Sequence, residues 1–235
     1  MRTALGIITA LVIAAPLAAQ ARGADPTTQI KGTGKLPSGW MMRFDPHAGP
    51  APTPDQVVFT PEGSGFQFTS GPAAIYYNPK DMGKGEFAVS ATFTQKKSVG
   101  HEAYGIFIGG KNLQDSTQSY IYFVVKPCRS RGDCKEAGAT LGEALVSQRT
   151  SDGKPVALVP SAHSDLVKVD DPADGHATNT LLIHVAADSI HFVLNGQLFK
   201  AVAKSDLHGA TTDGQTGIRI NHNIDVHVDW KGVDK

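Results

Sequence analysis

The chain has 235 residues, in which 22 Lys and Arg balance 22 Asp and Glu. A neutral chain without a basic block has no electrostatic footprint for nucleic acid and no polybasic patch for anionic lipid, so we expect neither partner. The length suits one domain of the sandwich or barrel class.

The N-terminus has the pattern of a secretory signal peptide. Arg2 supplies a positive charge, residues 4–17 are apolar, and Ala19-Gln20-Ala21 is a small-x-small cleavage site. A membrane anchor is the alternative, but a spanning helix needs about 20 apolar residues and this run is shorter. We expect cleavage after residue 21, a flexible leader over 22–39 and a single domain over 40–235. The mature protein is then a secreted or bacterial periplasmic monomer without a membrane span.

The rest of the chain predicts short strands separated by Gly, Pro and Asp turns. Order is expected to begin near Trp40, and residues 45–54, with four prolines, predict a surface loop. The expected strands are 57–60, 66–69, 73–77, 86–95, 104–108, 120–125, 144–149, 156–159, 166–169, 181–185, 189–194, 197–202, 217–220 and 226–229. Helical character is limited to single turns near 116–119, 133–139 and 205–209. Many short strands of this kind predict an all-β fold, a two-sheet antiparallel jelly-roll sandwich.

Alternation along several of these strands indicates which side chains enter the core. In the 86–95 strand the larger apolar residues recur at every second position, as in a half-buried strand. The same pattern predicts these inward-facing residues in the C-terminal strands: Ile190, Phe192, Leu194, Val226, Val228 and Trp230.

Asn195-Gly196 lies between two β-rich runs and predicts a two-residue hairpin turn. A type I′ turn needs positive φ at both central residues, which Asn and Gly tolerate best.

The two cysteines, Cys128 and Cys134, form an isolated close pair. In an exported protein such a pair predicts a disulfide bond that stiffens a loop, because a redox or metal role favours Cys-x-x-Cys or further ligands nearby.

These C-terminal segments carry a resemblance. The strand–Asn195-Gly196–strand unit, and the Gly217–Ile220 segment followed by Val226–Asp229, resemble the closing strands of the concanavalin A-like lectin/glucanase superfamily. Within it the chain is most similar to bacterial secreted 3-keto-disaccharide-hydrolase-like domains and to laminin-G-like modules. The resemblance implies a jelly-roll sandwich and a carbohydrate partner. It rests on turn and core residues, so it concerns the fold and reaches function only by analogy.

The sequence does not assign catalytic residues. Retaining sugar hydrolysis needs two carboxyl groups about 5–5.5 Å apart, and no strand carries the alternating acidic pattern of the jelly-roll glucanases. Asp225, His227 and Asp229 share one face of the last strand. They are interpreted either as a small catalytic or metal face or, as we favour, as the solvated outer face of a half-buried strand.

Metal ligands also lack a recognisable spacing. The chain has nine histidines. His184 and His191 flank one hairpin, and His222 and His227 lie in the last strands, so exposed histidines on neighbouring strands could bind Zn²⁺ or Cu²⁺. No His-x-His or His-Glu-x-x-His spacing supports such a site. The oxygen-rich loop 170–175 could hold Ca²⁺, yet it lacks the later acidic residue of calcium loops. We therefore predict no metal site and no cofactor, with Ca²⁺ at this loop as the alternative.

Sugar binding needs aromatic faces and planar polar groups. The candidate ligand-binding residues are Arg43, His101, Tyr104, Tyr120, Tyr122, Arg219, Asn221, His222 and Asn223, and Trp40 is a further aromatic candidate. Tyr120 and Tyr122 share one strand face, and Arg219 points away from Ile218 and Ile220. We predict a secreted sandwich that binds carbohydrate on its concave face. The alternatives are a glycoside hydrolase or polysaccharide lyase of the same fold, and a structural or adhesion module without a small ligand.

Overall fold

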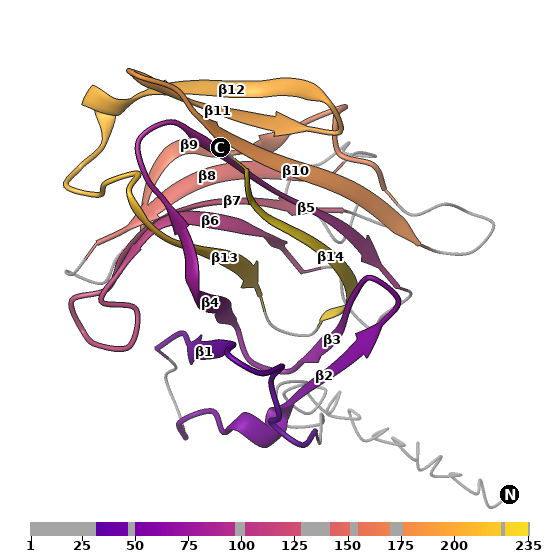
Figure 1. The fold of residues 1–235 in the computed structure, drawn as a ribbon. Helices are drawn as coiled ribbons and strands as arrows, with labels where there is room; N and C mark the ends of the chain where they lie inside the picture. The colour runs from indigo at the N-terminus through magenta and orange to yellow at the C-terminus, as the bar shows by residue number, and fades with distance from the viewer. Residues whose placement is uncertain are drawn as a thin grey trace, which may run out of the picture.

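The computed structural model describes residues 32–46, 50–96, 102–127, 142–150, 155–169, 176–221 and 224–234. Its strands form two seven-stranded antiparallel sheets that pack face to face (Figure 1). This is the predicted all-β jelly-roll sandwich. No helix in these ranges is both long and apolar enough to cross a membrane.

The first sheet, sheet A, has the spatial order β1-β4-β13-β6-β7-β8-β9. Its strands are β1 (Met41–Phe44), β4 (Ala74–Gly83), β13 (Gly214–Ile220), β6 (Tyr104–Lys111), β7 (Ser119–Lys126), β8 (Glu143–Arg149) and β9 (Pro155–His163). Sheet B has the order β12-β11-β10-β5-β14-β3-β2. Its strands are β12 (Gln197–Ala203), β11 (Ser189–Leu194), β10 (Ala177–Val185), β5 (Phe87–Gln95), β14 (Ile224–Asp234), β3 (Gly65–Ser70) and β2 (Val57–Glu62). In the described ranges the connections contain two short 3₁₀ helices, η2 (Pro54–Gln56) and η3 (Lys204–Asp206).

The core lies between the sheets and follows the predicted alternation. Phe87, Val89, Ala91 and Phe93 of β5 are buried, while the residues between them are half-buried on the outer face. Phe93 stacks on Tyr104 of the facing sheet with ring centroids 4.9 Å apart. The five aliphatic and Phe residues predicted inside β11 and β14 are all fully buried. Trp230 is partly buried at the end of the core, where its Nε1 donates to Asp81 Oδ2 at 3.0 Å.

The predicted hairpin turn is confirmed. Asn195 and Gly196 have φ of 52° and 81°, and Leu194 pairs with Gln197 across the turn. Asn195 also uses its side chain, because Oδ1 accepts the Thr180 amide proton at 2.9 Å and Nδ2 donates to the Leu166 carbonyl at 2.7 Å. The turn therefore joins β11 to β12 and also anchors a neighbouring loop.

The strand expected over 166–169 is wrong, since this segment is a turn. The buried side chain of Asn179 takes both backbone groups of Lys168: its Oδ1 accepts from the amide at 2.8 Å and its Nδ2 donates to the carbonyl at 2.9 Å. Side-chain amides thus satisfy this backbone in place of a strand partner.

Strand β4 runs past the predicted end at residue 77, even though Pro79 cannot donate to a ladder. The proline lies in an irregular part of the strand, where the β13 pairing jumps from Tyr77 to Met82.

Part of the expected leader lies against the sandwich. Residues 32–37 run beside the start of β2, where the Gly34 amide donates to the Val57 carbonyl at 3.4 Å. The expected signal peptide and the Cys128–Cys134 disulfide lie outside the described residues and stay predictions.

Candidate functional site

Sheet A carries a second cluster of large side chains on the face turned away from the core. Alternation sends Ile218 and Ile220 of β13 into the main core and Arg219 to this outer face, as predicted. The apolar members of the outer cluster are Ile75, Tyr77, Phe107, Leu113 and Tyr120, each at most 2% exposed, with Tyr122 partly buried against them. The part of the outer face that these residues form is therefore covered.

A glycine in β13 lets the outer cluster lie close to the sheet. A Cβ on Gly217 would stand 2.6 Å from a ring carbon of Phe107 and 2.3 Å from the Tyr76 carbonyl oxygen. Only a residue without a side chain permits the Phe107 ring to lie over this point of β13. Phe107 in turn contacts Tyr120, whose ring centroid lies 5.4 Å away.

The connection between β6 and β7 is fastened across this face. Arg43 Nη1 donates to the carbonyl oxygens of Leu113 and Asp115 at 3.0 and 2.6 Å. Gln114 Nε2 donates to the Met42 carbonyl at 3.2 Å and to the Tyr77 hydroxyl at 2.8 Å. Arg43, predicted as a ligand-binding residue, thus directs its guanidinium to this loop and helps to cover the cluster.

A carboxylate follows β1 and meets two arginines. Asp45 is held at the end of the strand by its amide, which donates to the Ala73 carbonyl at 2.9 Å. Arg219 makes a bidentate pair with it, Nη1 to Oδ1 at 2.7 Å and Nη2 to Oδ2 at 2.5 Å. Arg149 Nη2 adds a longer contact to Oδ2 at 3.4 Å. Planar two-point pairing of this kind fixes both groups.

Burial and the arginines act in opposite directions on the pKa of Asp45. Burial disfavours the charged form, but the charge and hydrogen bonds of Arg219, with Arg149 and Arg43 further away, hold the pKa below its ordinary value. Burial likewise raises the pKa of the neighbouring Tyr120 hydroxyl. At neutral pH Asp45 is therefore a carboxylate that accepts hydrogen bonds and does not donate a proton.

Part of this arrangement reaches the surface. Tyr122, Asp45 and Asn221 are half-buried, in contrast to the covered cluster beside them. Arg219 joins the three: its Cζ lies 5.7 Å from the Tyr122 ring centroid, and its Nη2 donates to Asn221 Oδ1 at 3.3 Å as well as to Asp45. We call Tyr122, Asp45 and Asn221 the Tyr122 patch.

The predicted ligand-binding residues thus fall into separate places. Tyr122, Arg219 and Asn221 are brought together, and Tyr120 shares their face but is fully buried. Tyr104 is the clearest error, because it points into the core, where its hydroxyl accepts from Asn179 Nδ2 at 3.0 Å. The dense apolar run around it does not show which face each residue takes. Trp40 also packs against the core, edge-on to Trp230. His101, His222 and Asn223 lie outside the described residues.

Asp45 and Arg149 are not among the residues that the sequence suggests for a site. The prolines around Asp45 predict a surface loop, although Asp45 lies two residues after Arg43 and a strand places such residues on the same face. Arg149 ends β8 directly opposite Tyr120 of β7. That register depends on pairing between strands far apart in sequence, so no local signal could reveal it.

Asp225, His227 and Asp229 lie on the outer face of sheet B, opposite buried Val226 and Val228. Their partners come from the end of β2 and the turn after it: His227 Nδ1 lies 3.2 Å from Glu62 Oε2, and Ser64 Oγ donates to Asp229 Oδ1 at 2.6 Å. In the described part of the chain, no group of three or more His, Cys, Asp or Glu is arranged to hold a metal ion. The 170–175 loop considered for Ca²⁺ falls in a gap between the described ranges.

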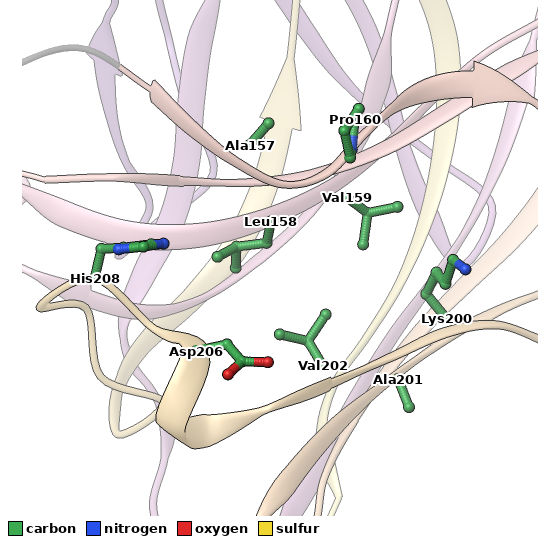
Figure 2. Close-up of a pocket in the computed structure, with 9 residues that line it drawn as sticks. All are labelled: Ala157, Leu158, Val159, Pro160, Lys200, Ala201, Val202, Asp206 and His208. Carbon is green, nitrogen blue, oxygen red and sulfur yellow. The ribbon is translucent and has the colours of Figure 1, made fainter.

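A separate hollow of about 420 Å³ opens between the edge strands of the two sheets. Figure 2 shows β9 on one side, the chain around η3 on the other, and the Asp206 carboxylate directed into the space between them. Its lining is Ala157, Leu158, Val159, Pro160, Lys200, Ala201, Val202, Asp206 and His208. No Trp, Tyr or Phe is among them, so this hollow lacks the stacking platform that sugar recognition favours.

No protein-family model and no curated protein matches the chain. Solved structures do match. The carbohydrate-binding module CBM66 from Bacillus subtilis has a TM-score of 0.57 at 11% identity, covering 84% of this chain and 96% of its own. A Bacillus subtilis protein of unknown function with a galectin-like fold has a TM-score of 0.57 at 10% identity, with 89% and 93% covered.

A glycoside hydrolase family 16 endo-glucanase from Bacteroides ovatus is also similar, with a TM-score of 0.54 at 9% identity, covering 85% of this chain and 95% of its own. At such identities the likeness concerns the fold. The chain therefore has the concanavalin A-like jelly-roll fold that its C-terminal segments predict. The narrower likeness to 3-keto-disaccharide-hydrolase-like and laminin-G-like domains stays a prediction.

Proposed function

We propose that this chain is an exported protein that binds carbohydrate on the outer face of sheet A, at the Tyr122 patch. The observation that carries the proposal is the contact of one guanidinium with all three groups, since Arg219 pairs with Asp45, bonds Asn221 and lies beside the Tyr122 ring. An aromatic ring, a carboxylate and an amide are the groups that recognise a sugar ring and its hydroxyls. The similar structures include a carbohydrate-binding module, which supports the same class of ligand.

The patch suits binding because its polar groups are held before a ligand arrives. Asp45 is fixed by two-point pairing, and Arg219, only 6% exposed, is fixed by Asp45 and by the ring beside it. A preorganised group loses little conformational entropy when it accepts a hydroxyl hydrogen bond. Arg219 therefore acts behind the patch as a positioning residue, in place of the direct sugar contact that the sequence suggested.

A glycan-processing enzyme is the second candidate, since a family 16 hydrolase shares the fold. Hydrolysis at this patch would need a carboxyl group with a raised pKa as proton donor. The pKa of Asp45 is lowered by its arginines, which is the wrong direction for that role. This favours binding over acid-assisted hydrolysis here, and a structural or adhesion module is the remaining alternative.

A glycan array followed by calorimetry on the best glycan tests the proposal. Tyr122→Ala and Asn221→Ala remove patch groups and leave the Asp45–Arg219 pair in place. Each should weaken binding by roughly tenfold or more, about 1.4 kcal/mol. Leu198→Ala is the matched control, because Leu198 is 58% exposed on β12 of the other sheet.

The result that contradicts the proposal is equally specific. If Tyr122→Ala and Asn221→Ala bind the glycan as the unmodified protein does, the ligand lies elsewhere. If no glycan binds but reducing ends or unsaturated uronides appear, the chain is an enzyme. If neither binding nor turnover occurs across the array, the non-ligand module is favoured.

A further inference from the structure

A histidine pair lies on the outer face of sheet B, away from the Tyr122 patch. His184 of β10 and His191 of β11 are direct cross-strand partners. Their ring centroids are 5.6 Å apart with the planes tilted by 55°. The next positions in the same row across the sheet are Ala88 of β5 and Ala201 of β12, so small side chains flank both rings.

The separation of the two rings matches what a shared metal ion requires. A metal–nitrogen bond of about 2.1 Å puts an ion roughly 3.2 Å from the centroid of the imidazole that binds it. Two imidazoles on one ion then have centroids about 5.2 Å apart at a tetrahedral angle and about 5.5 Å apart at 120°. The observed spacing is within a few tenths of an ångström of these values, which rotation about the side-chain bonds can supply.

A hydrogen-bond chain orients one of the rings. Ser189 Oγ donates to Asp188 Oδ1 at 3.0 Å and lies 3.3 Å from His191 Nε2. Because the serine hydroxyl has one proton and gives it to the carboxylate, it accepts from Nε2–H of His191. This assigns the tautomer in which Nδ1 carries the free lone pair. Metal-binding histidines characteristically donate their other ring N–H in this way.

His184 is the more exposed histidine of the pair. Within the described ranges no protein group bonds its ring, and the side chain is exposed on its strand. A hollow of about 250 Å³ opens beside it, with Glu86 and Asp234 in the wall. These carboxylates make the surroundings of the ring electrostatically favourable to a cation.

We infer that His184 and His191 form a surface site for a divalent first-row transition ion of the imidazole-binding class, such as Zn²⁺ or Cu²⁺. This inference goes beyond the proposed function, because it concerns the other sheet and needs no glycan. Two protein ligands hold the ion and water completes its coordination. The sequence places the two histidines on either side of one hairpin, and the β10–β11 register makes them direct cross-strand partners.

Calorimetric titration of the full mature chain with Zn²⁺ tests the site. The unmodified protein should bind one ion that His184→Ala and His191→Ala each weaken by roughly tenfold or more. His208→Ala is the matched control, an exposed histidine next to η3, and should bind like the unmodified protein. Ser189→Ala should give an intermediate loss, because it removes the group that orients His191.

Far-UV circular dichroism of each variant confirms that the sheet is intact, as expected for substitutions on an outer face. A second readout is the melting temperature, which Zn²⁺ should raise in the unmodified protein and in His208→Ala but not in either pair variant. The site is overturned if the unmodified protein binds no Zn²⁺, or if either single pair variant binds it with unchanged affinity.

Discussion

The outer faces of the two sheets follow the same strand alternation and yet differ in environment. On sheet A, outward-facing Phe107 and Tyr120 are fully buried, and a carboxylate there pairs with two arginines. On sheet B the outer face carries pairs such as Thr92–Thr180 and the exposed His184. A side chain that points away from the core is therefore not necessarily exposed, because a connection can cover it.

The connection that covers part of sheet A accounts for the different exposure of the two outer faces. The β6–β7 connection is fastened over sheet A by Arg43 and Gln114, so large aromatic residues there lose contact with water. The threonines of sheet B bond one another across strands, Thr94 to Thr178 at 3.0 Å, and stay exposed. In a covered, low-dielectric environment an ion pair must be complete, whereas on a hydrated face water screens each charge.

The largest effect is expected from Asp45→Ala. It leaves the buried Arg219 without its two-point partner, and breaking a buried pair costs about 3–5 kcal/mol of unfolding free energy. Asp229→Ala is the matched change on sheet B, where the carboxylate meets the Ser64 hydroxyl and His227 in place of a buried arginine, and should cost less than about 1 kcal/mol. Urea denaturation measures both. Equal losses would show that the two faces have the same electrostatic environment and would undo the comparison.

The pH dependence of stability sharpens the same point. Because the folded pKa of Asp45 lies below its unfolded value of about 3.9, the unfolded chain binds more protons and stability rises with pH. The Asp45 contribution is complete above the unfolded pKa and is lost as pH falls through the folded pKa. The stability difference between the unmodified protein and Asp45→Asn should therefore be large at pH 6 and shrink below about pH 4. A difference that does not change with pH over this range would contradict the assigned direction.

Gly196→Val tests a local feature of sheet B. Gly196 has φ of 81° and no atom near the position of an added Cβ, so the cost is conformational strain alone. A β-branched residue in this conformation should cost about 1–3 kcal/mol. Gly196→Asn is the control, since Asn tolerates positive φ. Thermal melting should separate the two variants, and an unchanged melting temperature for the valine variant would mean that the turn does not constrain the sheet.

The smallest of these effects is expected from Gln114→Ala, which removes the amide that bonds Met42 and Tyr77. Two lost hydrogen bonds should cost roughly 1–2 kcal/mol. Hydrogen exchange should become faster in the 112–118 connection and stay unchanged in the β10–β11 hairpin. Exchange rates that are unchanged in both segments would show that other contacts hold the 112–118 connection on sheet A.

The sequence determined the features that depend on neighbours along the chain. The alternation in β5, the Asn195-Gly196 turn and the two-sheet class could all be predicted, because a strand has period 2 and positive φ favours Asn and Gly. The resemblance in the last strands extended this to the jelly-roll fold. The side on which Arg219 lies followed from the same alternation.

Only the tertiary structure decided what those outward side chains meet. Asp45 and Arg219 are 174 positions apart, and Tyr120 meets Arg149 only through the β7–β8 register. The turn at 166–169 depends on Asn179, which bonds the backbone of Lys168 and also donates to the Tyr104 hydroxyl in the core. The His184–His191 pair likewise needs the β10–β11 register. Pairing between strands places these groups, and the propensity of each segment alone carries no information about the register of that pairing.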